Sequence, residues 1–187
     1  MKFEGEHLIP GMVGHFFVLL AFVTSIISTI SYFRAANSKD PFQRIAWLKY
    51  ARISFFIQAG SIIAIFGCIY FICSNHYFEY LYAYKHASKE LEPKYLLACI
   101  WEGQEGSFLL WSIWHVVLGT ILILKAREWE ANVLCVINVA QVLLMFMLLG
   151  LYFGEVRIGS SAFVFTRNEI NGPIFGRADY LSLLKME

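Results

Sequence analysis

Charged residues are scarce in this chain of 187 residues and make up only 16% of it, whereas soluble domains carry about 25%. Four stretches contain no Asp, Glu, Lys or Arg at all: 7–33, 53–78, 106–124 and 131–154. Each approaches or exceeds the ~20 residues that a helix needs to cross about 30 Å of hydrocarbon. We therefore expect an all-α membrane protein rather than a soluble domain.

Cysteine motifs and basic clusters are also missing, and their absence excludes classes of function. The four cysteines form no Cys-x-x-Cys or Cys-x-x-Cys-His motif, so the chain is neither a thiol oxidoreductase nor itself a c-type cytochrome. We interpret them as small apolar residues, with a disulfide between Cys73 and Cys99 as the less favoured alternative. No basic cluster is interleaved with aromatic residues, which excludes nucleic acid as a partner.

The uncharged stretches predict four transmembrane helices, at about 11–33, 53–73, 107–124 and 132–153. The connection 34–52 carries five Lys or Arg residues against the single acidic residue Asp40, and the positive-inside rule places it in the cytoplasm. Both termini and the loops 74–106 and 154–187 then lie outside, on the periplasmic side of the cytoplasmic (inner) membrane. The first stretch is too long, and its flank too acidic, for a cleaved signal peptide, so we expect it to be retained.

The outer loops are expected to contain short helices. Five aromatic residues between His76 and Tyr84 indicate an interfacial helical segment that lies on the membrane. The run 87–91 favours a helix that Pro93 ends. Two more short helices are expected, over 94–101 and over 180–186.

Polar residues inside the spans fall at helical spacing and indicate which faces point inward. One face of the third span carries Ser107, Trp111, Trp114, His115 and Leu118. Gln58 in the second span, with Asn138 and Gln141 in the fourth, favours interhelical hydrogen bonds, which contribute ~0.6 kcal/mol each.

Two histidines within the spans, His15 and His115, are candidate haem ligands, because a neutral imidazole in a membrane helix can ligate haem iron. Both lie nearer the outer side, so their depths are compatible. We favour a structural role for each. The alternative is a quinone-binding redox subunit with a bis-histidine haem.

The most informative segment is 101–111, Trp-Glu-Gly-Gln-Glu-Gly-Ser-Phe-Leu-Leu-Trp, at the entrance to the third span. Acidic groups at such a depth are costly unless they face protein, water or a ligand, and a helix N-terminus would stabilise Glu105. Gly103 and Gly106 permit tight turns and the close approach of a ligand. Three tryptophans would cover the faces of a flat apolar ligand: Trp101, Trp111 and Trp114. We expect a ring-lined pocket suited to a porphyrin at this point.

This segment resembles the Trp-Gly-x-x-Glu-Gly-Ser-Leu-Leu-Leu-Trp run of the CcmF-type haem lyases of cytochrome c maturation, which are multi-span membrane proteins. Eight positions match that run: Trp101, Gly103, Glu105, Gly106, Ser107, Leu109, Leu110 and Trp111. Gly14-His15-Phe16 is similar to the start of the family. The chain resembles only about the first third of a typical member. The resemblance therefore implies the N-terminal part of a larger protein, or one part of a split lyase.

The resemblance also implies a function, since the family attaches haem to apocytochrome c outside the cytoplasmic membrane by adding cysteine thiols across the haem vinyl groups. The implied partners are haem, apocytochrome c, other maturation proteins of the membrane, and the lipid bilayer. The candidate haem-binding residues are Trp101, Gly103, Glu105, Gly106, Ser107, Trp111, Trp114 and His15. We expect haem to bind only with the missing C-terminal portion or with partner subunits.

The chain departs from the family at positions that matter for catalysis. Glu102 stands where the family usually has Gly, and Gln104 where it often has His. The tryptophan-rich haem signature and the haem-ligand histidines of the family are absent. We therefore assign no catalytic residue and no metal-ion site, and lyase activity of this chain by itself stays open. The alternative function is a small four-helix structural or assembly subunit of a respiratory membrane complex.

Overall fold

The computed structural model describes residues 5–88, 93–153, 156–170, 172, 177 and 180–184. Four long helices dominate it: α1 (Leu8–Asn37), α2 (Pro41–Ser74), α5 (Gln104–Lys125) and α6 (Glu130–Leu149). Each of these segments is long and apolar enough to cross a membrane. The expectation of an all-α membrane protein with four spans is thus confirmed at the level of architecture.

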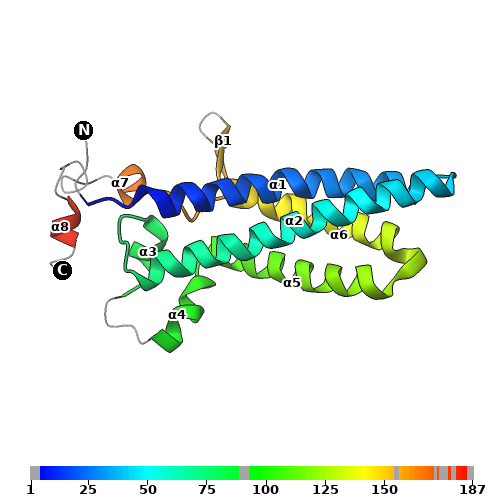
Figure 1. Ribbon diagram of the computed structural model, residues 1–187. Coiled ribbons are helices and arrows are strands. Elements are labelled where there is room, and N and C mark those ends of the chain that lie inside the picture. The colour runs from blue at the N-terminus through cyan, green and yellow to red at the C-terminus, as the bar shows by residue number, and fades with distance from the viewer. Residues whose placement is uncertain are drawn as a thin grey trace.

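The four helices form a bundle in which α1 packs mainly against α2 and α6, and α5 packs against α6. Figure 1 shows that the short helices gather at one end of the bundle, together with both ends of the chain. These are α3 (Leu81–His86), α4 (Pro93–Ile100), α7 (Thr166–Glu169) and α8 (Tyr180–Leu184). The α1–α2 and α5–α6 turns lie at the opposite end (Figure 1). We call the end with the short helices the outer end, because the charge pattern predicts that it lies outside; its side of the membrane stays a prediction.

Helix α2 begins well before the predicted span, at Pro41 rather than near residue 53. The Asp40 side chain caps it by accepting a hydrogen bond from the backbone N–H of Phe42 at 3.0 Å, and Pro41 occupies the first turn, where no N–H donor is needed. Its 34 residues extend over about 51 Å at 1.5 Å per residue. This is longer than the ~30 Å hydrocarbon core, so part of α2 extends beyond the membrane.

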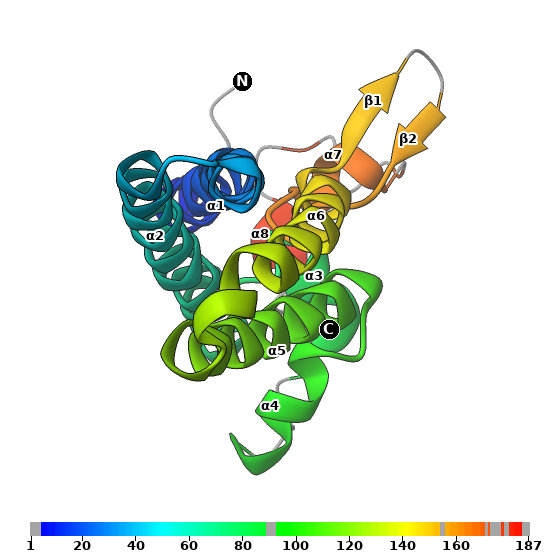
Figure 2. The same ribbon diagram turned by 90° about the vertical axis from the view of Figure 1, so that its right-hand side faces the viewer.

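Helix α6 ends at Leu149, so the last residues of the predicted span, 150–153, leave the helix. Gly150 has a φ of 62°, in the left-handed region where helices commonly end. Strand β1 (Leu151–Phe153) then pairs antiparallel with β2 (Val156–Ile158), and Figure 2 shows this hairpin projecting away from the bundle. The apolar residues that follow Leu149 therefore form a β-strand, and α6 is shorter than the span predicted from the sequence.

The short helices follow the sequence pattern in part. Helices α4 and α8 lie where the sequence predicts them, within the residues that the structure describes. Residues 87 and 88 are not helical, in contrast to the predicted helix over 87–91, and the rest of that run lies outside the described residues. Pro93 begins α4 instead of ending a helix, in keeping with the preference of proline for the first turn.

An ion pair joins α2 to α6 near the end opposite the outer end. Arg52 donates from Nε to Glu130 Oε1 at 2.7 Å and from Nη2 to Glu130 Oε2 at 2.6 Å. The Glu130 side chain is only 2% exposed, whereas that of Arg52 is 46% exposed. The two-point geometry holds the two helices in one register.

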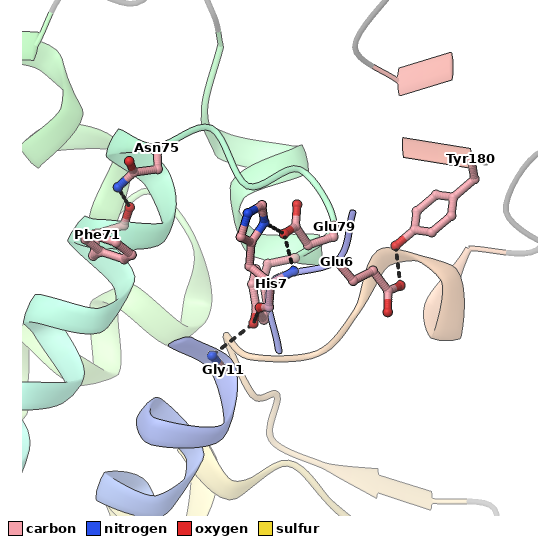
Figure 3. A network of polar contacts seen from close by, with 8 residues as sticks. Glu6, His7, Gly11, Phe71, Asn75, Glu79 and Tyr180 are labelled. Atoms are coloured by element: carbon pink, nitrogen blue, oxygen red, sulfur yellow. Dashed lines mark hydrogen bonds and ion pairs between the residues drawn. The ribbon is translucent and has the colours of Figure 1, made fainter. Parts of the chain in front are cut away.

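Two buried carboxylates hold the outer end together (Figure 3). Glu79 accepts a hydrogen bond from the backbone N–H of His7 at 3.1 Å and lies 2.8 Å from His7 Nδ1. Glu6 accepts from Arg167 Nε and from the Tyr180 hydroxyl, each at 2.7 Å. The segment before α1 is thereby joined to the α2–α3 connection, to α7 and to α8.

Candidate functional site

The start of α5 lies beside a pocket of about 400 Å³ at the outer end. Six of its lining residues carry the argument below: Tyr82, Lys85, His86, Gly103, Glu105 and Ser161. They come from α3, from α5 with the residue before it, and from the segment that follows β2. Segments that are far apart in the sequence therefore build this pocket, which we call the α5 entrance pocket.

The two motif glycines are needed because other atoms approach their backbone closely. A Cβ at position 106 would lie 1.6 Å from the carbonyl oxygen of Ile100 and 2.5 Å from the Tyr82 hydroxyl oxygen. A Cβ at position 103 would lie 2.9 Å from His86 Nε2 and 3.3 Å from Glu105 Oε2. Gly106 thus lets α5 pack against the end of α4, and Gly103 leaves room for polar side chains of the pocket.

Tyr82 forms the buried wall of the pocket, and its side chain is held by the backbone of α4. The Tyr82 hydroxyl donates to the carbonyl oxygen of Ile100. Burial raises the pKa of Tyr82 above its usual value, and the negative charge of Glu105 raises it further. Tyr82 therefore stays a neutral hydrogen-bond donor at physiological pH, and its role at this position is to hold α3 against α4.

The pocket carries ionisable groups of both signs, with Lys85 and His86 on one side and Glu105 on another. His86 Nδ1 lies 3.8 Å from Glu102 Oε2, and the Glu102 side chain is 65% exposed. Glu105 is partly buried and lies in the first turn of α5, where the helix dipole stabilises a carboxylate. Such a pocket suits a small polar or zwitterionic group, for which it offers both a cation and an anion.

The tryptophans do not line this pocket. Trp111 and Trp114 lie on the face of α5 that points away from the bundle, and they are 59% and 57% exposed. Trp101 is 40% exposed. Ser107, also in the motif, donates from its hydroxyl to the carbonyl oxygen of Trp101 at 3.2 Å. The expected ring-lined slot for a porphyrin is not formed by the described residues, because helical spacing turns both α5 indoles away from Glu105.

The two span histidines lie in different surroundings. His15 lines an apolar groove of about 460 Å³ with Met12, Phe16 and Phe163 among its neighbours. His115 lies at the α5–α6 contact, where its Nδ1 is 3.0 Å from Gln141 Oε1. The structure therefore does not assemble the bis-histidine site considered from the sequence.

The cysteines agree with the favoured interpretation. Cys73 and Cys99 are both buried and both free. Burial raises the pKa of Cys99, and the nearby Glu102 carboxylate raises it further. This thiol therefore stays protonated and unreactive at physiological pH.

Sequence reasoning missed most of the pocket. Tyr82 carried only the general signal of an aromatic interfacial segment, and His86 only that of a loop histidine. Lys85 and Ser161 carried no signal that separates them from other surface residues. These residues come together only because α3 and the segment after β2 fold back over the start of α5. No local sequence pattern predicts this arrangement.

The comparisons with known proteins concern the fold. No family model and no curated protein matches the chain. A solved structure described as "Cytochrome c Heme Lyase CcmF" superposes on 88% of this chain with a TM-score of 0.71 and 21% sequence identity. The four-helix unit has the fold of part of CcmF. This chain covers 26% of that CcmF chain, in agreement with the resemblance of the sequence to only a part of the family.

Proposed function

We propose that this chain is a membrane component of the cytochrome c maturation machinery that assists haem handling and the covalent attachment of haem to apocytochrome c. Two independent likenesses support the proposal: the match of residues 101–111 to the CcmF-type run, and the CcmF fold of the bundle. The observation that carries it is that Gly103 and Glu105 of that run line one pocket, while Gly106 packs against the Tyr82 hydroxyl in the wall of the same pocket.

The residues present decide which part of a haem this pocket suits. Lys85, His86 and Ser161 would complement the carboxylate edge of a haem through charge and hydrogen bonds. The flat apolar faces find no counterpart among the residues that line the pocket, so they require surfaces from further subunits or from further chain.

Each party has a distinct role in this proposal. Haem supplies the vinyl groups to which the cysteine thiols of the apocytochrome add. Lys85 and His86 hold the polar edge, and the Glu105 carboxylate, which lies beside Gly103 as His86 Nε2 does, orients these cationic side chains. The iron ligands come from outside the described part of the chain.

The test is complementation of a deletion strain of the native host. Glu105→Gln keeps the shape of the side chain and removes its charge. We expect about a tenfold lower yield of haem-stained cytochrome c, because the neutral amide no longer orients Lys85 and His86; this factor corresponds to a loss of ~1.4 kcal/mol in the free energy of haem binding. Glu102→Gln is the matched control, because this side chain is 65% exposed, and it should mature cytochrome c at a level close to wild type. Immunoblots must show equal amounts of each variant in the membrane.

A deletion strain with normal cytochrome c would contradict the proposal. Co-purification of the chain with a respiratory complex would then favour the structural or assembly subunit. Normal maturation by Glu105→Gln, with maturation lost on deletion, would instead keep the role of the chain and remove the role of the pocket.

A further inference from the structure

A second pocket lies at the end of the bundle opposite the outer end, where the α1–α2 and α5–α6 turns are found (Figure 1). Its volume is about 420 Å³, and three of the residues that line it are basic: Lys39, Arg44 and Arg127. Lys39 follows α1, Arg44 lies in the first turn of α2, and Arg127 begins the short helix η1 (Arg127–Trp129) between α5 and α6. This pocket, which we call the basic pocket, therefore gathers cations from two turns that are far apart in the sequence.

The protein neutralises these cations only in part. Arg44 Nη2 donates to the backbone carbonyl oxygen of Glu128 at 3.3 Å and so joins α2 to η1. The Glu128 side chain also lines the pocket, but none of the three basic side chains forms an ion pair with a carboxylate among the described residues. Asp40, next to Lys39 in the chain, caps α2 instead. Three positive charges against one negative charge leave an excess of two, which attracts an anion to the pocket.

The basic pocket also has an apolar wall, and it lies at the depth of lipid headgroups. Ile45 and Leu48 of α2 line it beside the cations. Arg127 lies about 4.5 Å beyond the predicted end of the third span, at 1.5 Å per residue, and the headgroup layer on each side of the hydrocarbon is about 5–8 Å thick. Trp129 borders an adjoining hollow that shares Arg44 with the basic pocket, and it is exposed, as is typical of aromatic residues at a membrane interface.

We infer that the basic pocket binds the phosphate group of an anionic phospholipid such as phosphatidylglycerol. Lys39 and Arg127 pair with the phosphate oxygens, which match the planar fork of a guanidinium. Ile45 and Leu48 contact the glycerol and the first methylene groups of the acyl chains. Basic pockets at the ends of membrane helices suit such headgroups. The inference is independent of the proposed haem function.

Two other ligands fit these observations less well. A zwitterionic lipid has no net charge with which to balance the excess of two positive charges. Free inorganic phosphate has the charge, but it makes no use of the apolar wall.

The test titrates the purified chain in detergent with single lipids and follows binding by native mass spectrometry. Lys39→Gln with Arg127→Asn removes two charges of the pocket, and asparagine is chosen because it tolerates the φ of 45° at this position better than most residues. Arg44 is left unchanged because it also joins α2 to η1. Lys49→Gln with Lys125→Gln is the matched control, since it removes two charges near the same end from exposed residues that do not line the pocket.

Wild type should bind one phosphatidylglycerol at least about tenfold more tightly than phosphatidylcholine. The pocket variant should lose at least about tenfold in its affinity for phosphatidylglycerol, at about fivefold for each cation, whereas the control should change by less than about twofold. Equal losses in the two variants would show diffuse attraction to this end of the protein and overturn the inference. Unchanged binding by the pocket variant would overturn it too. The comparison of the two lipids needs no variant, and equal affinity of wild type for both would by itself overturn the inference.

A competition separates a lipid headgroup from a free anion. Inorganic phosphate, and in a second series glycerol 3-phosphate, is added to wild-type protein that carries phosphatidylglycerol. The lipid should stay bound at equal concentrations of the competitor, because only the lipid also contacts Ile45 and Leu48. Displacement of the lipid by either competitor at equal concentration would assign the pocket to a free anion and overturn the inference.

Discussion

Gly106→Ala tests most directly whether the motif glycine serves packing. The added Cβ would lie 1.6 Å from the carbonyl oxygen of Ile100, whereas contacts of a Cβ below 3.0 Å are essentially never found. The end of α4 or the start of α5 must therefore shift by about 1.4 Å. That atom is backbone, so no side-chain rotation can relieve the clash.

The expected loss of stability follows from three contributions. Overpacking of this kind costs ~1–3 kcal/mol. A shift of Ile100 also breaks the hydrogen bond that its carbonyl accepts from Tyr82, at ~1 kcal/mol. Alanine is a better helix former than glycine by at most ~1 kcal/mol. We expect a net loss of roughly 2–3 kcal/mol in the free energy of unfolding.

The assay is denaturant unfolding in detergent, with hydrogen exchange of the peptides that contain α3 and α4. Gly67→Ala in α2 is the matched control, because no atom lies within 4 Å of a Cβ there, and it should stabilise the protein by ~0.5–1 kcal/mol. Gly106→Ala should also speed exchange in α4. Wild-type stability and exchange in this variant would refute the packing argument.

Three further outcomes are expected. Arg52→Leu should lower the free energy of unfolding by roughly 2 kcal/mol, less than for a fully buried pair, because Arg52 is half exposed. The second substitution Glu130→Leu should recover part of this loss, because it removes the buried charge left without a partner. Equal stability of wild type and Arg52→Leu would contradict the prediction. Burial raises the pKa of Tyr80 to about 12, against about 10 in the unfolded chain. The contribution of Tyr80 to stability is therefore fully present below pH 10, and the free energy of unfolding should fall by roughly 2–3 kcal/mol as the pH rises to 12. The difference in stability between wild type and Tyr80→Phe should show this fall, and parallel pH curves for the two proteins would contradict it. Brominated lipids in nanodiscs should quench the fluorescence of Trp111 and Trp114 through their exposed faces, less so in Trp114→Phe, and unchanged quenching would show that this face is covered.

The motif 101–111 shows which features of the site could be predicted from the sequence and which could not. The sequence predicted that Gly103, Glu105 and Gly106 belong together at the start of a span, and in the structure Gly103 and Glu105 line one pocket while Gly106 packs against Ile100 and Tyr82. It also suggested that the nearby indoles would enclose the same ligand, which the structure does not show. A helix of 3.6 residues per turn sends residues 105 and 111 to different sides, and α3, which does close the pocket, carried no signal for this role.

The hydrophobic pattern by itself determined the class of the protein and the number of long helices. Each charged residue is unfavourable in hydrocarbon whatever its neighbours, so long uncharged stretches identify these helices without knowledge of the tertiary structure. It also determined which amides face inward. The tertiary structure decided which groups meet: Arg52 with Glu130, Glu6 with Arg167, and His86 with the start of α5. Such pairings depend on helix register and on loops that fold back over the bundle, and they arise between residues too distant in the chain for any local pattern to specify.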